Sequence, residues 1–123
     1  MDSKQTVVIL GASDKPERYS HKAQILLQDH GHNVILVSPK VKEVNGTPVL
    51  PNFEPIKEHV HTLTMYVSKK VSDNMVEEII ALSPERVIFN PGTENPILES
   101  ALKENGIDFE EACTLVLLNT NQF

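Results

Sequence analysis

The sequence is poor in cysteine, in long apolar runs and in positive charge, and each shortage excludes a class of protein. Cys113 is the only cysteine, and one thiol forms no intramolecular disulfide, so we expect a reducing compartment. The apolar run Val7–Leu10 is too short for a signal-peptide core or a membrane span. The formal net charge of −6 disfavours a non-specific nucleic-acid surface. We therefore expect a cytoplasmic protein that contacts neither nucleic acid nor membrane.

Short apolar segments alternate with helical patterns along the chain, which predicts a parallel sheet covered by helices. The first two strands are continuous apolar runs, as in strands buried on both faces. The predicted strands are Val7–Leu10, Val34–Val37, Thr62–Val67, Arg86–Phe89 and Ile107–Phe109. A chain of 123 residues suits one core. We predict one α/β domain over residues 1–123, a Rossmann-like three-layer sandwich with a parallel sheet of about five strands.

Capping residues mark the ends of three predicted helices between these strands. The predicted N-caps are Ser20, Ser72 and Asn95, and the C-terminal signals are Gly31, Ser83-Pro84 and Gly106. The segment Val41–Val60 is predicted to be irregular, with a turn at Asn45-Gly46 and a short helix near Glu54–His59.

In such a fold every strand-to-helix loop lies at the carboxyl edge of the sheet, where ligands bind. The first loop starts at Gly11, which permits a tight turn, and its small residues Ala12 and Ser13 let a phosphate approach the main chain. The following helix offers unpaired N–H groups, and Arg18 adds a cation. One glycine stands where the dinucleotide fingerprint needs three, so the loop is either a different phosphate loop or a solvated surface loop.

The residues of the second loop indicate which nucleotide would bind. An NAD-binding domain usually places Asp or Glu at the end of this strand, whereas here Ser38, Pro39 and Lys40 follow it. A cation at this position favours a ligand with an extra phosphate near the adenosine, and NADP and coenzyme A both qualify. The third loop, Val67-Ser68, is followed by two lysines, and the fourth is Asn90-Pro91-Gly92-Thr93.

Other groups that could carry chemistry give weak signals. Two carboxylates precede Cys113 and disfavour its thiolate, so we expect a small, partly buried residue rather than a nucleophile. The pairs His30/His32 and His59/His61 lack further ligands at metal-binding spacing. The sequence thus predicts an anion site without a visible catalyst.

Several segments together resemble the small bacterial and archaeal coenzyme A-binding proteins, which are similar to the N-terminal domain of the succinyl-CoA synthetase α subunit. The resemblance rests on the Gly-x-Ser loop with its Pro-x-Arg-Tyr-Ser extension, the Pro-Lys after the second strand and the Pro-Gly after the fourth. Two positions depart from it, because Ser38 replaces a frequent asparagine and Asn90 a frequent glutamine.

The resemblance implies that coenzyme A, or an acyl-CoA, binds at the carboxyl edge. The phosphate-facing residues would be Gly11, Ala12, Ser13, Arg18, Tyr19 and Ser20. Those near the adenosine would be Ser38, Pro39 and Lys40, and the other two loops would contribute Val67, Ser68, Asn90, Pro91, Gly92 and Thr93. Ligase activity is not implied, because the phosphorylated histidine of the synthetase lies in a further domain.

Two alternatives remain open. An NADP-linked oxidoreductase, or a subunit of one, would share the phosphate loop and Lys40 but would need a proton donor such as one of the two tyrosines, Tyr19 and Tyr66. A regulatory or interaction subunit would keep the fold without the ligand. The run Thr114–Leu118 is either core or a surface through which copies, or a larger enzyme, pair with the chain.

Overall fold

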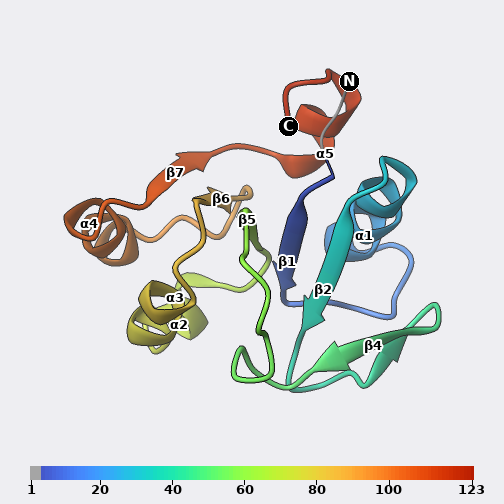
Figure 1. Ribbon diagram of the computed structural model, residues 1–123, viewed down its shortest axis with the longest axis horizontal. Helices are drawn as coiled ribbons and strands as arrows, with labels where there is room; N and C mark the ends of the chain where they lie inside the picture. The colour runs from blue at the N-terminus through green and yellow to red at the C-terminus, as the bar shows by residue number, and fades with distance from the viewer. Residues whose placement is uncertain (1–3) are drawn as a thin grey trace.

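The computed structural model describes residues 4–123 and has one seven-stranded sheet. The strands are β1 (Thr6–Leu10), β2 (Asn33–Val37), β3 (Glu43–Val44), β4 (Thr47–Leu50), β5 (Thr62–Met65), β6 (Arg86–Phe89) and β7 (Asp108–Glu111). Their order is β3-β4-β2-β1-β5-β6-β7, which Figure 1 shows from right to left. Every pairing is parallel except that of β3 with β4. The predicted Rossmann-like fold is confirmed, and a hairpin adds two strands to the five expected.

Helices cover both faces of the sheet. They are α1 (Tyr19–Asp29), α2 (Lys69–Ser72), α3 (Val76–Leu82), α4 (Pro96–Glu104) and α5 (Thr114–Asn119). Side chains alternate along each strand, so Val8 belongs to a core with α3 and α4, and Val7 to a second core with α1 and α5. Leu118 of α5 lies in that second core, while Val116 is exposed. No helix among residues 4–123 is long and apolar enough to cross a membrane.

The β3–β4 hairpin occupies part of the segment predicted to be irregular. Asn45 and Gly46 have φ values of 49° and 80°, as the two central residues of a type I′ turn require. The turn was predicted, but its strands were not, because β3 has two residues and Pro48 argues against a strand. The helix predicted near Glu54–His59 is wrong, because turns and bends occupy residues 51–55.

Two of the three predicted N-caps are wrong. The cap of α1 is Arg18, whose carbonyl accepts from the N–H of Lys22 at 3.2 Å, so the helix starts before Ser20. Ser72 ends α2 instead of starting a helix, and its hydroxyl is used in a tertiary contact. The predicted helix therefore splits into α2 and α3, with Met75 as the cap of α3. The third predicted cap, Asn95, is confirmed.

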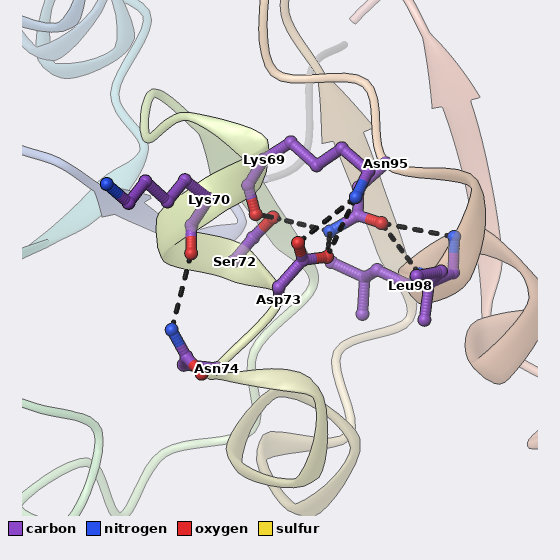
Figure 2. A network of polar contacts seen from close by, with 8 residues as sticks. Lys69, Lys70, Ser72, Asp73, Asn74, Asn95 and Leu98 are labelled. Atoms are coloured by element: carbon purple, nitrogen blue, oxygen red, sulfur yellow. Dashed lines mark hydrogen bonds and ion pairs between the residues drawn. The ribbon is translucent and has the colours of Figure 1, made fainter.

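Asn95 also joins two helices, as Figure 2 shows. Its Oδ1 accepts from the N–H groups of Ile97 and Leu98, both at 3.1 Å, and so caps α4. Its Nδ2 donates to the hydroxyl of Ser72 at 2.8 Å and to a carboxylate oxygen of Asp73 at 2.9 Å. Because the Asn95 side chain is fully buried, these four bonds have no water to replace them.

We predict that Asn95→Ala lowers the free energy of unfolding by about 2–4 kcal/mol, because it removes the cap and leaves buried partners unpaired. Urea denaturation followed by circular dichroism measures the change. Asn74→Ala is the matched control, since this exposed side chain makes one bond to the carbonyl of Lys70. An equal loss in the two variants would contradict the role given to Asn95.

Candidate functional site

The predicted site residues lie beyond the carboxyl ends of four neighbouring strands, β2, β1, β5 and β6. Main-chain hydrogen bonds join these strand ends directly. The N–H of Gly11 donates to the carbonyl of Val37 at 2.9 Å, and the N–H of Tyr66 donates to that of Leu10 at 2.9 Å. The structure thus brings the loops together at one edge of the sheet.

Gly11 lies against the start of the third loop. Its φ is +99°, and a Cβ atom there would lie 2.9 Å from the carbonyl oxygen of Tyr66 and 3.1 Å from Cγ1 of Val67. The chain leaves β1 toward β2 and later returns to β5 on the other side of β1. The contact therefore lies at the topological switch point, where folds of this kind bind ligands.

Main-chain donors are free along the first loop and the start of α1. Within residues 4–123, no acceptor is found for the N–H groups of Ser13, Asp14, Glu17, Tyr19, Ser20 and His21. Ser20 is buried, whereas Arg18 and Tyr19 are exposed. Free N–H groups and the partial positive charge of a helix start both favour an anion.

His21, which the sequence analysis did not single out, holds this loop in place. Its Nδ1 donates to the carbonyl of Ser13 at 3.0 Å, and its Nε2 accepts from the side-chain amide of Asn45 at 3.3 Å. One turn later, the amide of Gln24 donates to the carbonyl of Val44 at 3.3 Å. Both α1 side chains are buried, so they fix the first loop against the hairpin. No pattern in the sequence links His21 and Gln24 to Asn45 and Val44, because these residues meet only through the hairpin.

The second loop presents Lys40 at the same edge. The N–H of Ser38 donates to the carbonyl of Leu50 at 2.9 Å, and its hydroxyl accepts from the N–H of Lys40 at 3.2 Å. Ser38 is buried, and Pro39 and Lys40 are exposed. The buried serine thus shapes the turn that leaves the lysine side chain in solvent.

Asn90, predicted to border the cleft, has its side chain in internal hydrogen bonds. Its Nδ2 donates to Oγ1 of Thr64 at 2.7 Å and to the carbonyl of Met65 at 2.8 Å, and its Oδ1 accepts from the N–H of Thr114 at 2.9 Å. Its carbonyl accepts from the hydroxyl of Thr93 at 2.8 Å. Asn90 and Thr93 are buried and brace the fourth loop from below, while Pro91 and Gly92 are exposed.

Tyr66 bears on the oxidoreductase alternative, because Lys70 follows it by four residues. An enzyme of that kind would need a tyrosine whose pKa is lowered, so that its proton moves at neutral pH. Burial instead raises the pKa of Tyr66 to about 12, against smaller opposing effects of hydrogen bonds with Thr114 and Thr64. The phenol therefore keeps its proton at neutral pH and forms hydrogen bonds with the two threonines.

Charge is divided along this edge. Lys15, Arg18 and Lys40 are exposed beside β1 and β2 together with Asp14 and Glu17, whereas within residues 4–123 the carboxylates beyond β6 and β7 have no cation among them. There, burial and then hydrogen bonding to Glu111, together with the charges of Glu111 and Glu94, raise the pKa of Glu99 to about 7. An anion is thus disfavoured over β6 and β7 relative to β2 and β1.

Cys113 lies before a helix, and His59 and His61 each have a hydrogen-bond partner. Cys113 precedes α5 and is partly buried. His59 pairs with Glu85 at 2.6 Å, and His61 bonds to the hydroxyl of Thr62 at 2.7 Å. Among residues 4–123, no three His, Cys, Asp or Glu side chains form a group that could hold a metal ion.

The comparisons with known proteins agree with this architecture. The sequence matches the CoA binding domain family over residues 5–119, and the chain belongs to that family. A crystal structure of an uncharacterized protein shares 40% identity and a TM-score of 0.94, covering 99% of this chain and 100% of its own. The uncharacterized protein YneT of Bacillus subtilis (strain 168) is 24% identical over 81% of this chain and 74% of its own length.

A similarity in fold extends to a much larger enzyme. The dinucleotide-forming acetyl-coenzyme A synthetase 1 of Ca. Korarchaeum cryptofilum, solved with phosphate and ADP, has a TM-score of 0.74 at 14% identity. The match covers 88% of this chain and 25% of that one. At this identity the comparison shows a shared fold alone.

We predict that Gly11→Ala destabilises the protein by about 2 kcal/mol more than Gly92→Ala. Both glycines have positive φ, but a Cβ atom meets nothing within 4 Å at Gly92, whereas at Gly11 it meets main-chain atoms. Thermal and urea denaturation of the two variants measure the difference. Equal losses would mean that the contact with Tyr66 relaxes without penalty.

We predict that Glu99→Gln raises stability above pH 7 and leaves it unchanged near pH 4. The folded-state pKa of about 7 exceeds the ordinary value of 4.5, so the folded protein binds more protons between these values. Wild-type stability therefore falls as pH rises through that window, by about 1 kcal/mol after allowance for partial exposure.

Melting temperatures measured from pH 4 to pH 8 test this prediction. Glu104→Gln, at the other end of α4, controls for the loss of one negative charge. Parallel pH profiles for wild type and Glu99→Gln would contradict it.

Proposed function

We propose that this protein binds coenzyme A or an acyl-CoA at the carboxyl edge of its sheet, without catalysis of its own. The proposal is carried by the open N–H groups at the start of α1, with Lys40 at the end of the neighbouring strand, in a chain of the CoA-binding family. Such a pair suits a ligand with two separate phosphate groups.

The residues fit the diphosphate and 3′-phosphate of coenzyme A. Gly11, Ala12 and Ser13 would let the diphosphate approach the main chain, and the first turn of α1, with Arg18, Tyr19 and Ser20, would hold it. Ser38, Pro39 and Lys40 would lie beside the adenosine, with the lysine on the 3′-phosphate. The ligand would then continue past Val67 and Ser68 toward Pro91 and Gly92.

The absence of catalysis is proposed from the state of the reactive groups. The Tyr66 phenol holds its proton, and the Asn90 amide is fully committed to its internal partners. The raised pKa of Glu99 follows from burial and neighbouring carboxylates at the acidic end of the edge, away from the donors for the phosphates. The Tyr66 and Asn90 side chains, and the place of Glu99 beyond β6, support a binding platform rather than acid–base chemistry at the phosphate site.

Calorimetric titration with coenzyme A tests the proposal. We expect saturable binding that Lys40→Ala weakens by about 10- to 100-fold, because a charge-assisted phosphate contact contributes about 1.5–3 kcal/mol. Lys103→Ala, in the last turn of α4, is the control and should bind as wild type does.

Two outcomes would contradict the proposal. One is the absence of heat and of a thermal shift at millimolar coenzyme A. The other is tighter binding of NADPH than of coenzyme A in a parallel titration, which would favour the oxidoreductase alternative. Mass spectrometry of the small molecule that copurifies with the native protein would identify an acyl group.

A further inference from the structure

Two adjacent lysines follow β5, and only the first has a partner for its side-chain charge among residues 4–123. Lys69 donates from Nζ to both carboxylate oxygens of Asp73, at 3.0 and 3.3 Å. Hydrogen bonds from Lys69 and then from Asn95 hold the pKa of Asp73 below its usual value, so this carboxylate is charged. The charge of Lys69 is therefore paired within the protein.

The Lys70 side chain has no such partner. Its ammonium forms no ion pair or hydrogen bond with any residue from 4 to 123, and only its carbonyl is engaged, by Asn74. In Figure 2 the Lys70 side chain extends away from Asp73 and Asn95, whereas that of Lys69 turns into their network. The structure thus leaves one of the two charges available.

The sheet order places this free charge on a defined side of the first loop. Strand β5 neighbours β1 on the side opposite β2, and Gly11 contacts Tyr66 at the junction. Neighbouring strands lie about 4.8 Å apart, so the ends of β2 and β5 are separated by about 10 Å with the first loop between them. Lys40 and Lys70 therefore follow strands that lie on opposite sides of β1, from which the first loop starts.

We propose that Lys70 binds the 5′-diphosphate of coenzyme A from the β5 side, while Lys40 reads the 3′-phosphate from the β2 side. This inference rests on the proposed function. Lys69 does not bind the ligand, because its charge is paired with that of Asp73. The carboxylates beyond β6 and β7 support the assignment, since they direct the anionic part of the ligand toward β5, β1 and β2.

The proposal predicts a different effect of each lysine on the binding of coenzyme A and of dephospho-CoA. Dephospho-CoA lacks the 3′-phosphate but keeps the diphosphate. Lys70→Ala should therefore weaken coenzyme A and dephospho-CoA by the same factor, about 10- to 100-fold. Lys40→Ala should weaken coenzyme A alone and so remove the preference for it over dephospho-CoA.

Isothermal titration of both ligands against wild type and variants is the experiment. Lys69→Ala is the matched control, because it removes one positive charge from the neighbouring residue; it leaves Asp73 without its ion pair, so it should weaken both ligands, but by much less than Lys70→Ala does. Lys70→Arg should restore most of the affinity, since it keeps the charge. Lys70 is exposed, so an unchanged melting temperature for Lys70→Ala shows that the variant is folded.

The possible results discriminate between the two proposals. If wild type binds coenzyme A and Lys70→Ala binds it equally well, the role of Lys70 is wrong and the proposed function stands. The role is also wrong if Lys70→Ala affects coenzyme A but not dephospho-CoA, or if Lys69→Ala has the same effect as Lys70→Ala. If wild type binds neither ligand, the proposed function itself fails.

Discussion

The carboxyl edge of this protein depends on the contact between Gly11 and the main chain of Tyr66. Any side chain at residue 11 would meet the carbonyl oxygen of Tyr66, and the φ of +99° already excludes most residues. The contact lets the first loop turn across the switch point while the Gly11 N–H stays bonded to Val37. The end of β1 is thereby joined to β2 on one side and to β5 on the other. The loop segment that carries the free N–H groups follows directly after Gly11.

Three buried polar side chains hold loops and helices in place. His21 fixes the first loop to the hairpin, Asn90 joins the ends of β5 and β6 to α5, and Asn95 joins α2 to α4. Each is well shielded from water, so losing one partner would leave another buried group unpaired. Loops held in this way keep their N–H groups in place before a ligand arrives, which lowers the entropy lost on binding.

The sequence predicted the parts of this structure that depend on local patterns. Continuous apolar runs gave the strands, and Asn95-Pro96 gave the start of α4, because those signals act within a few residues. The parts it missed depend on distant partners. Ser72 has the chemistry of an N-cap but bonds to Asn95. The internal partners of Asn90, Thr64 and Thr114, are likewise distant in sequence. The two-residue strand β3 exists because β4 and α1 hold it, which no local pattern records.

The net charge of −6 sets a further requirement on any anionic ligand. A ligand with several phosphate charges is repelled by the protein as a whole, so binding depends on local groups that outweigh this background at short range. Cations at the edge lie beside β2, β1 and β5, where Asp14, Glu17 and Asp73 also lie, so the local field there depends on which lysines and arginines are not paired with these carboxylates. A lysine already paired with a carboxylate, as Lys69 is, adds little to such a local field. For such a ligand, an unpaired lysine such as Lys40 or Lys70 would therefore contribute more than a paired one.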